Sequence, residues 1–159
     1  PDHSSRNELS ASDFQGKPLP RPFGSEKWLT EKPETPLDER VIVLDFWATW
    51  CGPCIAASPK LAQIQKDYKD RVMVIGVGGS EPEQAVREYL DKHGAKYHHV
   101  FDGEKKLSGA MRVRGIPHVV ILSTDGTVRW QGNPHSPKFE RAVKQVVRVD
   151  PLLARRASN

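Results

Sequence analysis

Cys51 and Cys54 are the only cysteines of this chain, and two residues separate them. They follow the apolar run 41–47 and open a segment, 51–68, with the periodicity of a helix. A helix N-terminus presents unpaired N–H groups and the positive end of a macrodipole, and both favour a thiolate. The thiolate is the attacking species in disulfide exchange. The spacing therefore indicates a redox dithiol in which Cys51, nearer the helix start and more exposed, attacks and Cys54, more buried, resolves.

The residues around the two cysteines suggest a proton carrier and a contact surface. Asp45 is the only charged residue in the run 41–47. A lone buried carboxylate tends to keep its proton, which suits a general acid–base near neutral pH, although an aspartate that caps or pairs locally is the alternative. Gly52 and Pro53 form the loop between the cysteines, where the proline lacks an N–H and stiffens the backbone. Trp50 is expected to form a contact surface and Trp47 to lie in the core.

Strands and helices that alternate along the chain must position these groups. Apolar runs predict strands, and apolar residues at helical spacing predict helices. The expected strands are 41–47, 72–77, 97–101, 117–122 and 128–131, with a short strand or helical turn near 26–29. The expected helices are 51–68, 83–93, 105–111 and 136–149. The turn 124–126 predicts an antiparallel hairpin at the sheet edge, so the fold class is α/β, with a mixed sheet covered by helices.

The length of 159 residues suits one domain. We expect a proline-rich N-terminal extension over residues 1–40, which either packs on the domain or tethers it. The domain itself is expected over 41–149, followed by a flexible polar tail over 150–159.

Composition excludes several functions. The net charge of +4 comes without a basic stripe interleaved with aromatic residues, so no nucleic-acid partner is expected. No apolar run reaches the roughly 18 residues of a membrane span, and no signal peptide is visible, although a start at Pro1 is compatible with removal of an export signal. His93, His98 and His99 fit no standard metal-site spacing.

The motif 45–54, Asp-Phe-Trp-Ala-Thr-Trp-Cys-Gly-Pro-Cys, closely resembles the active site of the thioredoxin superfamily. Pro59 matches the proline of that family's active-site helix, the segment 114–117 (Arg-Gly-Ile-Pro) matches its cis-proline loop, and Gly132 matches the glycine after its last strand. The resemblance covers about residues 40–148 and implies a thioredoxin-like fold.

An additional helix and strand, 83–93 and 97–101, precede the cis-proline loop, and with the N-terminal extension they resemble the TlpA/ResA-like branch. Those proteins are mostly extracytoplasmic, so we expect an extracytoplasmic location, with the cytoplasm as the alternative. Two positions depart from the related proteins. Gly76 stands where thioredoxins carry a lysine, and Ala57 stands where ResA-like proteins carry a glutamate. Proton transfer to and from Cys54 is therefore expected to depend on Asp45.

The resemblance also implies a substrate site. Pro117 is expected to be cis, leaving the backbone of Ile116 free to pair with an extended substrate. His118 is a candidate to contact substrate or tune the thiolate, and a solvated or packed histidine is the alternative.

The resulting expectation is a monomeric reductase of protein disulfides that uses an upstream thiol donor and has no cofactor beyond the Cys51–Cys54 dithiol. An oxidase or isomerase, or a Cu(I)-binding protein that uses the same cysteines, remains as an alternative.

Overall fold

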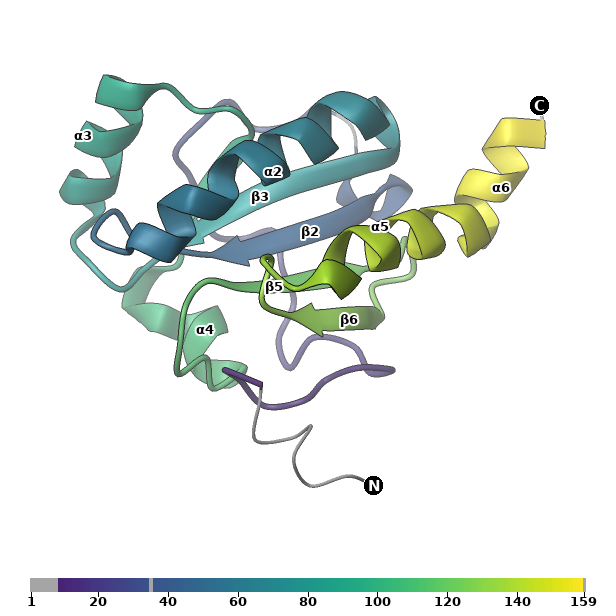
Figure 1. Cartoon of the computed structure of the whole chain (residues 1–159), viewed down its shortest axis with the longest axis horizontal. Helices are drawn as coiled ribbons and strands as arrows, with labels where there is room; N and C mark the ends of the chain where they lie inside the picture. The colour runs from purple at the N-terminus through teal and green to yellow at the C-terminus, as the bar shows by residue number, and fades with distance from the viewer. Residues whose placement is uncertain (1–8, 35, 159) are drawn as a thin grey trace.

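A six-stranded sheet forms the centre of the protein in the computed structural model, which describes residues 9–34 and 36–158. The strands are β1 (Lys27–Trp28), β2 (Val41–Phe46), β3 (Val72–Gly78), β4 (His98–Phe101), β5 (His118–Leu122) and β6 (Val128–Gly132). Their spatial order is β1-β4-β3-β2-β5-β6. Figure 1 shows the part of this order from β3 through β2 and β5 to β6. The strands β2, β3 and β4 run parallel, whereas β1, β5 and β6 pair antiparallel with their neighbours. The predicted mixed sheet with an antiparallel edge hairpin is confirmed.

The helices have nearly the predicted bounds. They are α2 (Gly52–Tyr68), α3 (Glu83–His93), α4 (Lys106–Ala110), α5 (Pro137–Val149) and α6 (Pro151–Ser158), with short 3-10 turns η1 (Leu37–Glu39), η2 (Lys69–Arg71) and η3 (Gly103–Lys105). The helices α2 and α5 cover the same face of the sheet (Figure 1). Alternate residues of the central strands point toward them, because successive side chains of a strand face opposite sides. These residues, including Val43 and Val74, pack with Leu61 of α2 and Phe139 of α5.

The opposite face of the sheet is covered by α4 and by the N-terminal extension. Phe14, Leu19 and Phe23 of the extension pack against the buried residues of this face. The extension also supplies β1, which adds to the sheet beside β4. Of the two alternatives for the extension, the structure therefore shows packing on the domain for residues 9–34; residues 1–8 lie outside the described part of the chain.

The C-terminal segment differs from its prediction. Residues 150–159 were expected to form a flexible tail, but Pro151–Ser158 form helix α6. The buried carboxylate of Asp150 accepts hydrogen bonds from the N–H groups of Leu152 (3.0 Å) and Leu153 (3.3 Å), as a helix N-cap does. The side chain of Leu153 is buried beside α5 in the main core. The guanidinium of Arg156 also donates to the carbonyl oxygen of Glu39 and to the carboxylate of Asp70, so polar contacts and one buried leucine together dock this helix.

Candidate active site

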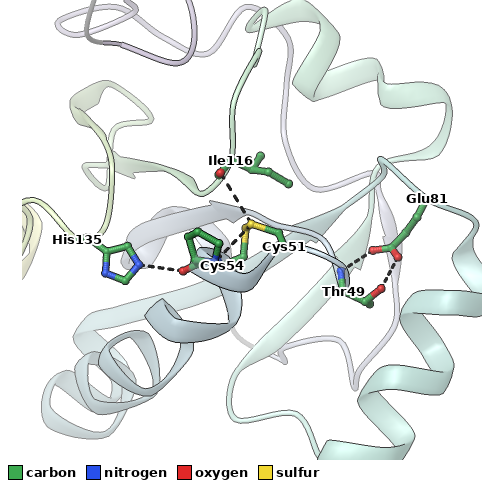
Figure 2. The surroundings of a disulfide bond; sticks show 7 residues. Thr49, Cys51, Cys54, Glu81, Ile116 and His135 are labelled. Atoms are coloured by element: carbon green, nitrogen blue, oxygen red, sulfur yellow. Dashed lines mark hydrogen bonds between the residues drawn. A yellow bond between two sulfur atoms is a disulfide. The ribbon is translucent and has the colours of Figure 1, made fainter.

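Cys51 and Cys54 form a disulfide at the start of α2, with their Cα atoms 5.2 Å apart (Figure 2). Cys51 is the N-cap of the helix, and its Sγ accepts a hydrogen bond from the backbone N–H of Cys54 at 3.2 Å. The same N–H is available to a thiolate at Cys51 once the disulfide is reduced. Exposed fractions of 5% for Cys51 and 3% for Cys54 have the predicted order, but both residues are buried. Access to the sulfur atoms is therefore narrow.

The surface around the disulfide is formed by the predicted loop residues. Trp50 is 66% exposed, and Gly52 and Pro53 are also exposed. The Ile116–Pro117 peptide bond is cis, as predicted. The carbonyl oxygen of Ile116 lies 3.8 Å from Cys51 Sγ, so this loop stands directly beside the disulfide (Figure 2). The structure thus brings the exposed residues Trp50, Gly52 and Pro53 together with the half-buried Ile116 and the buried Pro117 around the disulfide.

His118 does not belong to this surface. It is the first residue of β5, 1% exposed, and its register partner is Phe46, on the sheet face away from α2. The side-chain amide nitrogen of Gln131 lies 3.2 Å from His118 Nε2 and donates to it. Burial lowers the pKa of His118 to about 4. The prediction of His118 as a substrate contact is wrong, because strand alternation turns the residue after Pro117 away from the dithiol.

Asp45 lies on β2, on the sheet face that α2 covers, and is 2% exposed. Its Oδ1 has no hydrogen-bond partner among the described residues, so the alternative of a locally capping or paired aspartate is not observed. Burial raises the pKa of Asp45 from 3.8 to about 7. Asp45 can therefore both take and release a proton near neutral pH, which is the property required of a general acid–base. Its register partner on β3 is Gly76, the residue that the sequence places where thioredoxins carry a lysine.

Two contacts that position the active-site loops were not predicted. Glu81, after β3, accepts hydrogen bonds from the backbone N–H of Thr49 (2.7 Å) and from the Thr49 hydroxyl. His135, after β6, places its Nε2 2.8 Å from the carbonyl oxygen of Pro53 (Figure 2). These pairs are 32 and 82 residues apart in the sequence, and no local pattern connects them.

Other ligand classes find no site in the part of the chain that the structure describes. No group of three or more histidine, cysteine, aspartate or glutamate side chains there could hold a metal ion. No helix within 9–34 or 36–158 is long and apolar enough to cross a membrane.

A family model of thioredoxin-like proteins matches residues 38–128, more than half of the chain. The chain belongs to the thioredoxin-like family. The match includes the disulfide, Asp45 and the cis-proline loop, and it agrees with the thioredoxin resemblance of the sequence.

Relatives of this thioredoxin-like chain include proteins of the ResA type. It is 30% identical over 108 residues to thiol-disulfide oxidoreductase ResA of Bacillus thuringiensis, covering 66% of this chain and 62% of that protein. It is also 30% identical over 91 residues to thioredoxin-like protein YneN of Bacillus subtilis, covering 55% of this chain and 53% of that protein. The matched segments thus span only about half to three-fifths of the relatives' lengths.

Solved structures support the same fold. A thiol:disulfide interchange protein of Chlorobium tepidum superposes with a TM-score of 0.66 at 25% identity, over 82% of this chain and 97% of that one. A protein from Bacteroides thetaiotaomicron superposes with a TM-score of 0.73 at 22% identity, over 90% of this chain and 94% of that one. The second similarity concerns the fold alone.

Proposed function

We propose that this thioredoxin-like protein is a thiol–disulfide oxidoreductase that reduces disulfides of other proteins. The observation that carries the proposal is the arrangement at the start of α2. A Cys51–Cys54 disulfide lies there beside an exposed tryptophan, and the buried Asp45 lies beneath α2. The names of the ResA relatives and of the Chlorobium tepidum structure support thiol–disulfide exchange as the reaction class.

The reaction begins with the reduced dithiol. The Cys51 thiolate attacks one sulfur of a substrate disulfide, forms a mixed disulfide and releases the first substrate thiolate. The Cys54 thiol then gives its proton to the Asp45 carboxylate and attacks Cys51 Sγ, which releases the second substrate thiolate. Two electrons pass to the substrate, and the protein ends with the Cys51–Cys54 bond. An upstream thiol donor must reduce this bond before the next cycle.

Substrate is held, in this proposal, on the surface beside the disulfide. Trp50, Gly52 and Pro53 offer exposed surface next to Cys51, and the carbonyl oxygen of Ile116 lies 3.8 Å from Cys51 Sγ. An extended substrate backbone can pair with Ile116 while its disulfide faces Cys51 Sγ. We propose that the protein acts as a monomer outside the cytoplasm, in line with the ResA-like resemblance.

Reduction of insulin disulfides, with dithiothreitol as the donor, tests the proposal. Wild-type protein should accelerate the reduction, and Cys51→Ser should abolish the acceleration. An oxidase would instead introduce disulfides into a reduced substrate protein and show little insulin reduction. Stoichiometric Cu(I) binding by Cys51 and Cys54 without any thiol–disulfide turnover would contradict both enzymatic functions.

A further inference from the structure

A row of three residues crosses the sheet beneath α2. Asp45 on β2 pairs in register with Gly76 on β3, and Gly76 pairs in register with His99 on β4. Register partners of neighbouring parallel strands direct their side chains to the same face. Asp45 and His99 therefore face the same buried layer, with only a glycine between them.

Gly76 makes room for the imidazole ring of His99. A Cβ atom built at Gly76 would lie 2.5 Å from Cε1 of His99, as close to Nδ1, and 3.0 Å from Nε1 of Trp47. Contacts this short would force the ring away, so any other residue at position 76 would displace it. The imidazole of His99 thus lies over Gly76 of β3, on the sheet face that also carries the side chain of Asp45.

Three polar atoms in this layer have no hydrogen-bond partner among the described residues. They are Oδ1 of Asp45, Nδ1 of His99 and Nε1 of Trp47, in residues that are 2%, 4% and 6% exposed. Buried polar atoms are almost always hydrogen-bonded, to protein or to ordered water. The imidazole of His99 and the indole N–H of Trp47 both lie next to Gly76, and Asp45 is the register partner of that glycine. An acceptor carboxylate, an imidazole and an indole donor form a complementary set of the kind that buried water connects.

Trp47 connects this layer to the resolving cysteine, because Trp47 and Cys54 belong to the same buried cluster. The pKa of Tyr97 is raised mainly by burial and secondly by the charge of Asp45. Tyr97 therefore lies close to Asp45. The hydroxyl of Tyr97 shares a hydrogen bond of 3.2 Å with Ser58 Oγ. Ser58 lies one turn after Cys54 on α2, so both residues occupy the same side of that helix.

Packing alone does not explain the choice of histidine at position 99. The ring stacks on Tyr97 with centroids 5.0 Å apart and meets Trp47 edge-on at 5.2 Å. A phenylalanine would make the same ring contacts without burying the unpartnered Nδ1. The cost of burying that nitrogen atom points to a use for it.

We propose that His99 is a positioning residue for the resolving step: it hydrogen-bonds to Asp45 through a bridging water molecule and stabilises the carboxylate that accepts the proton of Cys54. This inference rests on the proposed oxidoreductase function. The proton leaves Cys54 Sγ and binds Asp45, while the Cys51–Cys54 bond forms and the Cys51–substrate bond breaks. Before the transfer His99 donates an N–H to the bridging water, and the water donates a hydrogen bond to the carboxylate. His99 remains neutral throughout.

The charge states of the surrounding groups agree with this role. Burial, followed by the charge of His98, lowers the pKa of His99 to about 4, so its ring is neutral at physiological pH. The titratable neighbours of His99 are Tyr97, whose ring stacks on it, His98, whose charge acts on it, and Asp45, across Gly76. Trp47, which also contacts the ring of His99, lies in one cluster with Cys54 of α2 and Tyr89 of α3, and Tyr89 contacts His93.

Two substitutions at position 99 separate positioning from packing. His99→Phe keeps the ring and removes the nitrogen atoms, whereas His99→Gln keeps a hydrogen-bond donor and removes the ring. His98→Gln, next to it in sequence and half-exposed, is the matched control. The substrate is a thionitrobenzoate disulfide, whose two coloured thiolates are released in separate phases, the first by Cys51 and the second by Cys54.

We expect His99→Phe to move the pH midpoint of the second phase upward by about one unit, because the carboxylate loses a hydrogen-bond donor. Below the midpoint the second phase should slow about tenfold. The first phase should be unchanged, and His99→Gln and His98→Gln should stay near wild type. A wild-type profile for His99→Phe together with a slowed His99→Gln would show a packing role and overturn the proposal.

A second pair of measurements tests the coupling of Asp45 and His99, and the second of them needs no variant. In an Asp45→Asn background, His99→Phe should have no further effect on the second phase; an equal effect in both backgrounds would contradict the proposal. In the reduced wild-type protein, the imidazole nitrogen resonances of His99 should shift as Asp45 titrates, and constant resonances would contradict it too. If the wild type fails to reduce insulin but these patterns appear, the proposed function fails and the Asp45–His99 coupling stands.

Discussion

Replacing Asp45 by asparagine should stabilise the folded protein at neutral and alkaline pH. Asp45 is 2% exposed, and burial raises its pKa from 3.8 to about 7. Between these two pH values, the folded protein keeps a proton at Asp45 that the unfolded chain has released. The stability of the wild type therefore falls as the pH rises from about 4 to about 7, and it stays constant above that.

The size of this effect follows from the same pKa shift. A shift from 3.8 to about 7, at roughly 1.4 kcal/mol per pH unit, corresponds to about 4 kcal/mol at pH 8. Asparagine has nearly the shape of the protonated acid and never ionises. Asp45→Asn should thus match the wild type near pH 4 and exceed its free energy of unfolding by up to about 4 kcal/mol at pH 8.

Guanidinium unfolding of the oxidised proteins at several values from pH 4 to pH 8.5 measures this difference. Oxidised protein is used because the disulfide then constrains both unfolded chains equally. Asp125→Asn is the control, because the pKa of Asp125 is shifted in the opposite direction. It is lowered to about 2, mainly by the hydrogen bond from Ser123. That variant should not gain stability at alkaline pH. A stability difference for Asp45→Asn that stays constant with pH, or has the opposite sign at pH 8, would refute the account of Asp45.

Three further predictions concern the dithiol and its surroundings. Cys54→Ser should accumulate mixed disulfides with substrate proteins through Cys51, detected on non-reducing gels; adducts that require Cys54 instead would reverse the assignment of the nucleophile. Trp50→Ala should raise KM for insulin about fivefold, because Trp50 is 66% exposed beside the disulfide and is available to contact a protein substrate. The rate with a small aromatic disulfide should change less than twofold. Equal losses of activity with both substrates would argue against a contact surface at Trp50. His118→Asn should lower the free energy of unfolding at pH 7 by about 1 kcal/mol. Between pH 6.5 and pH 4 the wild type should lose stability, because the pKa of His118 is lowered in the folded protein, and the variant should lose less of it in urea unfolding. A parallel loss of stability in both proteins would contradict the burial of a neutral His118.

The sequence predicted those parts of the fold that depend on local patterns. The strands β2 and β3 are continuous apolar runs, and α3 begins and ends where the helical periodicity does. The redox pair was visible because both cysteines lie within one helical turn. Segments without a repeating pattern were harder: Phe14 and Phe23 stand among prolines and polar residues, and only the tertiary structure shows that they cover one face of the sheet.

The contacts that the sequence did not reveal depend on register and on distant loops. Whether His99 lies above Gly76 depends on how β3 and β4 align, and a shift of one residue would place it on the other face. The same alternation explains why His118, although adjacent to the cis proline, faces away from the dithiol. Glu81 and His135 reach the active-site loops only because distant turns lie together in the fold.

The equilibrium reduction potential of the Cys51–Cys54 pair tests the central claim most directly. The measurement equilibrates the protein with dithiothreitol or glutathione buffers and follows the fraction of disulfide. A reductase of protein disulfides should have a potential near that of thioredoxin, about −270 mV. A value near −120 mV, typical of a strong disulfide oxidant, would contradict the proposed direction of electron flow.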